Sequence, residues 1–228
     1  MLFIGFTFIL LLWFSKKANR PANRFLAAAL AVAVLWIARI IVIDTGLNIY
    51  ASFWSRLPLQ FSLALGPLIF FYVRKITRPQ FPFRRSDLWH FSPLLLELSA
   101  FAFEIAESVK TGAPTYDTLV FQRVNLVLLL MAFGSVVVYL YRCRMLIEGF
   151  YQQQKFNDGD RHRHELRWLH RLLTVFGILW LLWLPCMAAD YFLYDCQLPL
   201  HLYYLLYLLL MPSLIWVAVR AFLRQEPG

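Results

Sequence analysis

Three ionisable residues, His90, Glu97 and Glu104, recur at intervals of seven within one otherwise apolar stretch of the sequence. Seven residues make about two turns of an α-helix, so the three side chains are expected on one helical face. An ionisable group inside a membrane span costs roughly 2.5–3.5 kcal/mol at the bilayer centre on insertion scales, and such groups often mark binding sites or proton relays. Glu97, near the middle of the stretch, is therefore a candidate proton or ion site. The alternative is a protonated, hydrogen-bonded carboxyl that only fixes the helix.

Three further charged residues, Arg39, Arg123 and Asp190, lie towards the outer ends of other apolar stretches, at a depth similar to that of Glu104. Together they predict a polar pocket in the outer half of a helical bundle, with both arginines facing the two carboxylates. Such a pocket could bind a small polar or anionic ligand. In the alternative interpretation these charges pair with one another or snorkel to the interface, and only fix helix contacts. Interhelical hydrogen bonds from three amides could complete the network: Gln60, Gln122 and Asn125.

Catalytic and cofactor chemistry finds little support in the sequence. All five lysines lie between the apolar stretches, which excludes a Schiff base on a buried lysine. His162, His164 and His170 form the best histidine cluster, but residues two apart diverge on a helix, which disfavours zinc. No facing pair of histidines at one depth indicates haem. We therefore expect no enzyme, no metal and no cofactor.

Composition defines the class of protein. The chain has 228 residues, of which 61% are hydrophobic and only 15% charged, and its mean hydropathy is +0.60. Soluble domains are usually about 45–50% apolar and about 25% charged. The three cysteines do not form a disulfide framework, because Cys186 and Cys196 would lie about 15 Å apart on a helix. These values exclude a soluble enzyme, a disulfide scaffold and a disordered chain, and predict an integral membrane protein.

Seven apolar segments separated by polar breaks predict an all-α integral membrane protein, with a seven-helix transmembrane domain over residues 1–219 and the start of a cytoplasmic linker over 220–228. The first segment has about 14 residues, which is short for a span of about 20. The segments are Met1–Phe14, Phe25–Ile43, Leu57–Val73, Leu88–Ile105, Thr118–Tyr141, Leu172–Tyr194 and Leu200–Val219.

The basic residues indicate the orientation of these spans. Eighteen of the 22 lysines and arginines fall in residues 16–24, 74–85, 142–171 and 220–224, which would all lie on one side of a seven-span protein. By the positive-inside rule the N-terminus is then outside and the C-terminus cytoplasmic. The longest inner loop is predicted from about Arg142 to Arg171, with a basic helix starting in its second half at the lipid headgroups.

Several loop sequences resemble a known family. They are Leu65-Gly-Pro-Leu-Ile-Phe-Phe-Tyr-Val-Arg-Lys-Ile-Thr77, then Phe83-Arg-Arg-Ser-Asp-Leu-Trp-His-Phe-Ser-Pro93, with Asn19-Arg-Pro-Ala-Asn-Arg-Phe-Leu26 and Trp168-Leu-His-Arg-Leu-Leu173. Together they resemble the N-terminal membrane region of AraC-type transcriptional regulators, over almost the whole chain. The resemblance implies a bacterial inner-membrane location and a cytoplasmic helix-turn-helix domain after the last span. Such a domain is absent from these 228 residues, so no direct contact with nucleic acid is expected from this chain.

These observations favour a membrane-embedded sensor that controls a cytoplasmic DNA-binding domain or a partner protein, and so regulates transcription. A ligand or membrane condition in the outer half would bias two arrangements of the bundle. Paired DNA half-sites would require a homodimer. Two alternatives stay open: a small transporter or channel with Glu97 as its proton or ion site, and a structural scaffold whose charged pairs only hold helices together.

Overall fold

The computed structural model describes residues 2–15, 20–44, 61–111, 119–154 and 160–193, with five further positions between 212 and 219. In these ranges every regular element is a helix and no strand occurs, which confirms the all-α prediction for the described residues. The elements are α1 (Leu2–Phe14), α2 (Arg20–Asp44), α5 (Ser62–Thr77), the 3₁₀ helix η1 (Arg85–Phe91), α6 (Ser92–Thr111), α7 (Leu119–Gln154), α8 (Asp160–Leu181) and α9 (Trp183–Leu193).

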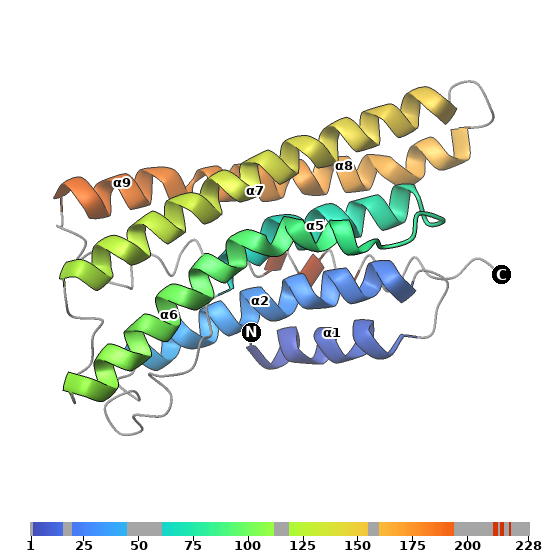
Figure 1. Ribbon diagram of the computed structural model, residues 1–228. Helices are drawn as coiled ribbons and strands as arrows, with labels where there is room; N and C mark the ends of the chain where they lie inside the picture. The colour runs from blue at the N-terminus through green and yellow to red at the C-terminus, as the bar shows by residue number, and fades with distance from the viewer. Residues whose placement is uncertain are drawn as a thin grey trace.

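The helices run back and forth roughly along one direction (Figure 1). In the described chain α1 packs on α2, α2 on α5, and α5 on α7, while α8 lies beside α7 and continues into α9. The ends of α5 and α7 lie at the same end of the bundle as the beginnings of α2 and α8 (Figure 1). We call this end the basic end, because it carries most of the described cations, among them Arg20, Arg24, Arg74, Lys75, Arg78, Arg84 and Arg85.

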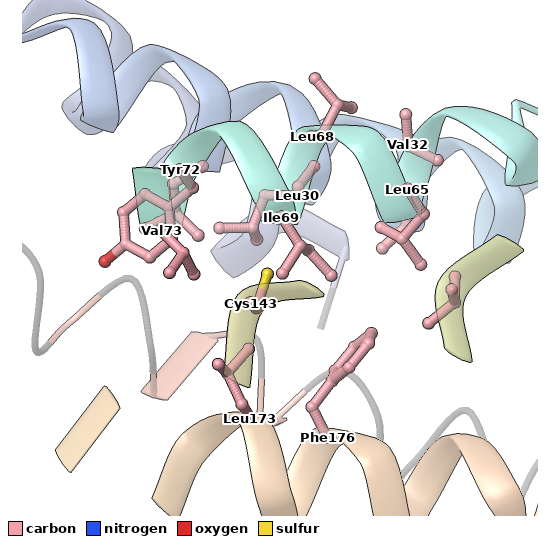
Figure 2. Packing of buried hydrophobic residues seen from close by; sticks show 14 of the residues in the cluster. Leu30, Val32, Leu65, Leu68, Ile69, Tyr72, Val73, Cys143, Leu173 and Phe176 are labelled. Carbon is pink, nitrogen blue, oxygen red and sulfur yellow. The ribbon is translucent and has the colours of Figure 1, made fainter. Parts of the chain in front are cut away.

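α5 is the buried centre of the bundle. Twelve of its 16 residues are buried, as expected for a helix that contacts neighbours on most of its surface. Figure 2 shows Ile69 and Val73 of α5 next to Cys143 of α7, with Leu173 and Phe176 of α8 on the other side of that cysteine. α5 is thus joined to α7 and α8 by one continuous hydrophobic core.

Gly66 marks the closest approach between α5 and α7. A Cβ atom at this position would lie 2.8 Å from the Tyr139 ring and 3.3 Å from the Ser135 carbonyl oxygen. Real Cβ atoms do not come as close as 2.8 Å to a neighbour, so the Tyr139 ring would have to shift, and the Ser135 carbonyl leaves little room beside it. This close contact fixes how α5 and α7 lie against each other, because interhelical contact in a membrane depends on such close approach of backbones.

Three helical stretches are long and apolar enough to cross a membrane: Arg20–Arg39, Arg123–Phe150 and Leu169–Leu193. Much of the apolar surface of the second and third stretches is not covered, since Val127, Val138 and Ile178 are each about half exposed. The shorter apolar helix α1 has 13 residues, or about 20 Å, which is less than the hydrocarbon thickness of about 30 Å. The described chain is therefore a helical protein with the features of a membrane protein.

Helical structure extends into the region predicted as the longest inner loop. The span predicted to end at Tyr141 continues as helix α7 to Gln154, because residues 142–154 contain no proline and the Arg144 Nε donates to the Glu148 Oε1 at 2.8 Å, one turn along. Helix therefore occupies residues 142–154 and 160–171 of the predicted inner loop, and residues 155–159 lie outside the described chain. The basic helix expected in its second half is present as the first part of α8.

The predicted sixth span contains a break between α8 and α9 at Leu182. Pro185 explains it, since proline has no N–H to bond to the carbonyl four residues earlier and its ring clashes with that carbonyl. The seventh predicted span, Leu200–Val219, lies almost entirely outside the described residues, as does the linker over 220–228.

Candidate functional site

Glu97 of α6 holds the beginning of α5. Its side chain is fully buried, and three donors from α5 converge on its two oxygens. The Ser62 backbone N–H and hydroxyl donate to Oε1 at 3.0 and 2.7 Å, and the Leu63 N–H donates to Oε2 at 3.1 Å. Glu97 therefore acts as a helix cap that is supplied by a different helix.

The chemistry of a helix N-terminus explains this arrangement. The first N–H groups of any α-helix have no partner within the helix, and Phe61, which precedes α5, provides no side-chain cap. In a buried environment each unpartnered donor is costly. A carboxylate satisfies several donors together, and its negative charge is favoured by the positive end of the helix dipole. Glu97 thus supplies the N-terminal cap of α5 that the residues around Ser62 do not provide.

Arg39 of α2 joins this region from a third helix. Its guanidinium carbon lies 4.9 Å from the centre of the Phe101 ring, one turn after Glu97 on α6. Glu104, two turns after Glu97, is also buried. The structure thus places Glu97 and Glu104 on the inward face of α6, with Arg39 beside that helix.

Other predicted pocket residues lie elsewhere or outside the described side chains. Arg123 is exposed near the start of α7, where it makes no ion pair with any described residue, and Asn125 is half-buried. The side chains of Gln122 and Asp190 are not among those described, although both residues belong to helices, and Gln60 lies outside the described chain. The geometry therefore places Arg39 beside α6, the helix that carries Glu97, and leaves Arg123 exposed near the start of α7.

His90 lies apart from the two carboxylates of α6, because it belongs to the 3₁₀ helix η1 that precedes it. Its Nδ1 is 2.8 Å from the hydroxyl of Tyr139 on α7. The rings of Phe70 and Phe71 of α5 pack against the imidazole, with centres 5.9 and 5.5 Å away. His90 therefore connects η1, α5 and α7 near the basic end, outside the expected outer pocket.

The sequence interpretation missed Asp87, which holds the other end of α5. Its Oδ1 lies 3.0 Å from the Nη1 of Arg74 in the last turn of α5, and its Oδ2 accepts the Arg84 N–H at 2.9 Å. A signal was present, because Asp87 is the only acidic residue between Asp44 and Glu97, among five nearby cations. Two carboxylates of the η1–α6 segment thus bind opposite ends of α5.

Asp87 is expected to make the free energy of unfolding depend on pH in the acid range. Burial opposes ionisation, but the Arg84 N–H and the Arg74 guanidinium outweigh it and hold the pKa of Asp87 below its ordinary value of 3.8. A group with a lowered native pKa stabilises the fold fully above its ordinary pKa. That contribution disappears as the pH falls from there through the native value.

The variant Asp87→Asn tests this effect. At neutral pH it should lower the free energy of unfolding by about 1.5–3 kcal/mol, the usual range for hydrogen bonds to charged groups. Unfolding of wild type and variant is compared by tryptophan fluorescence as the pH is lowered, and the difference should shrink only below about pH 4. A difference that is equal at all pH values would contradict the role of the Asp87 charge.

No group of three or more histidine, cysteine or acidic side chains that could hold a metal ion occurs in the part of the chain that the structure describes. The described cysteines Cys143 and Cys186 are both free thiols. The chain was also compared with known proteins. No family model, no curated protein and no solved structure matches it.

Proposed function

We propose that this protein is a seven-span sensor of the bacterial inner membrane, with its N-terminus outside and its C-terminus in the cytoplasm. Its basic end faces the cytoplasm, where the positive-inside rule expects lysine and arginine. The alternating direction of the described helices supports this orientation, because it gathers the basic helix ends at one end of the bundle. The region of Glu97 and Arg39 then lies deeper, away from the cytoplasmic surface.

The observation that carries the sensor proposal is the double attachment of α5. Glu97 binds its first residues and Asp87 binds Arg74 in its last turn, and both carboxylates belong to the continuous segment of η1 and α6. A shift of α6 relative to α2 therefore acts on both ends of the buried central helix. A stimulus that favours one position of α6 changes the bundle at its cytoplasmic end, as a two-state sensor requires.

The output of the sensor is proposed to be control of transcription, through a cytoplasmic helix-turn-helix domain or a partner protein. The support is the resemblance of the loop sequences, including Phe83-Arg-Arg-Ser-Asp-Leu-Trp-His90, to AraC-type membrane regulators. A homodimer would place two such domains on paired half-sites. The ligand proposed for the outer half is small and polar or anionic, with Arg39 as its cationic contact.

The experiment fuses a bacterial DNA-binding domain to the C-terminus and measures a reporter gene while external pH, osmolarity and salt are varied. Arg39→Ala is expected to abolish the response while the protein still inserts, because Arg39 links α2 to the face of α6 that carries Glu97. Arg123→Ala is the matched control, since its side chain is exposed and unpaired among the described residues. An unaltered response of Arg39→Ala would contradict the proposal.

A further inference from the structure

The segment that joins α5 to α6 presents an unusual surface at the basic end. We call residues 78–89 the 78–89 turn. Its cations Arg78, Arg84 and Arg85 are all exposed, and none has a carboxylate partner among the residues that the structure describes. The nearest acid is Asp87, and its two oxygens are already occupied by Arg74 and the Arg84 backbone. The turn therefore displays positive charge that the described chain does not neutralise.

Large apolar side chains accompany these charges. Trp89 is 79% exposed and Leu88 is 57% exposed, although side chains of this size are usually buried when water surrounds a protein. A tryptophan at the end of a transmembrane bundle is typical of the interface between headgroups and acyl chains. The composition of this surface thus matches the interface between charged lipid headgroups and acyl chains.

The 3₁₀ geometry of η1 determines where its charged and its apolar side chains lie relative to one another. Residues three apart lie above one another in such a helix, so buried Asp87 and half-buried His90 form the inner side, while Arg85 and Leu88 share an outer side. Ser92 keeps helical dihedral angles, so η1 continues into α6 towards the middle of the bundle. A 3₁₀ helix rises about 2 Å per residue, so Leu88 and Trp89 lie about 6–8 Å further than Arg85 along the axis of η1.

The turn is held in place by its own contacts. Phe83 packs on Phe25 of α2 and Phe71 of α5, with ring centres 5.7 and 5.2 Å apart. The Phe81 N–H donates to the Arg78 carbonyl at 3.2 Å. None of these contacts uses the Arg84 or Arg85 side chain, so both guanidinium groups are available on a fixed backbone.

We propose that the 78–89 turn binds an anionic phospholipid of the cytoplasmic leaflet. Arg84 and Arg85 take the phosphate, because a guanidinium group donates two parallel hydrogen bonds to phosphate oxygens. Leu88 and Trp89 contact the beginning of the acyl chains, because they lie further than Arg85 along η1 towards the middle of the bundle. Charge complementarity decides the occupant, since the cytoplasmic leaflet carries anionic lipid and attracts basic segments beside membrane spans. This inference depends on the proposed membrane insertion and orientation.

The test uses the full chain in nanodiscs of phosphatidylcholine that contain either brominated phosphatidylglycerol or the same fraction of brominated phosphatidylcholine. Bromine quenches nearby tryptophan, and the part of the quenching that Trp89→Phe removes belongs to Trp89. We expect Trp89 to be quenched more strongly by the anionic lipid. The double variant Arg84→Gln/Arg85→Gln should weaken this preference roughly fivefold for each arginine removed.

The control double variant, Arg142→Gln/Arg144→Gln, removes the same charge from exposed positions of α7 and should keep the preference. Equal quenching of Trp89 by both lipids in the wild type would overturn the inference but leave membrane insertion intact. Absence of quenching of any tryptophan by either lipid would instead contradict membrane insertion itself. Loss of the preference on addition of inorganic phosphate would also overturn the inference, because it would identify a site for free phosphate.

Discussion

Glu97→Ala is expected to lower the free energy of unfolding by about 3 kcal/mol or more. The Ser62 N–H, the Ser62 hydroxyl and the Leu63 N–H all lose their partner, and each buried unsatisfied donor costs about 1–3 kcal/mol. Because Glu97 is fully buried, water cannot easily replace the carboxylate. The measurement is the unfolding transition of the detergent-solubilised protein, followed by tryptophan fluorescence.

Glu97→Gln distinguishes loss of the cap from loss of volume. Glutamine has the same size, but its amide NH₂ must face either the Ser62 donors or the Leu63 N–H, so about 1–3 kcal/mol should still be lost. Glu148→Gln is the matched control, since this carboxylate lies in an exposed pair with Arg144 and should change stability by no more than about 1 kcal/mol. If Glu97→Gln were as stable as the control, the capping role would be refuted.

Gly66→Leu is expected to force α5 and α7 apart and to prevent the native fold from forming in good yield. Even a Cβ would lie 2.8 Å from the Tyr139 ring, which would have to move, and 3.3 Å from the Ser135 carbonyl, so little space remains for the rest of a leucine side chain. Overpacking of a core typically costs about 1–3 kcal/mol and sometimes more. The yield of monodisperse protein on size-exclusion chromatography, with the unfolding transition of what remains, measures the effect.

Gly134→Leu provides an internal comparison on α7. Nothing lies within 4 Å of a Cβ at Gly134, so the same substitution there meets open space and should leave the yield unchanged. Gly66→Ala should be intermediate, because it introduces the clash without the rest of the side chain. Equal yields for Gly66→Leu and Gly134→Leu would show that the close approach of α5 and α7 does not support the fold.

The positions of the helices could be predicted from the sequence because apolar runs bounded by charged or turn residues are local signals. Phe25–Ile43 predicted most of α2 in this way. The end of α7 could not be predicted, since nothing in hydropathy distinguishes a helix that stops at the end of its apolar stretch from one that continues beyond it. The residues 142–154 are polar enough to be read as a loop, yet their helix propensity and the Arg144–Glu148 pair keep them helical.

The candidate site was predictable only in part. Heptad spacing correctly placed Glu97 and Glu104 on one face of α6, because spacing within a helix is local information. It could not identify Ser62 and Leu63 as the partners of Glu97, since their backbone N–H groups become donors to it only when two helices meet. His90 was assigned to the same face, but η1 is a 3₁₀ helix, and its different number of residues per turn directs His90 to Tyr139 instead.

The capping of α5 by α6 also constrains the order in which the chain folds during synthesis. When the ribosome has made α5, its first N–H groups have no partner until Glu97 is added, 35 residues after Ser62. At about 5–20 residues per second this delay lasts roughly 2–7 s, during which the first N–H groups of α5 lack the partner that they have in the folded bundle. The smallest unit in which these donors are satisfied is therefore the hairpin of α5, η1 and α6, which has to fold as a pair.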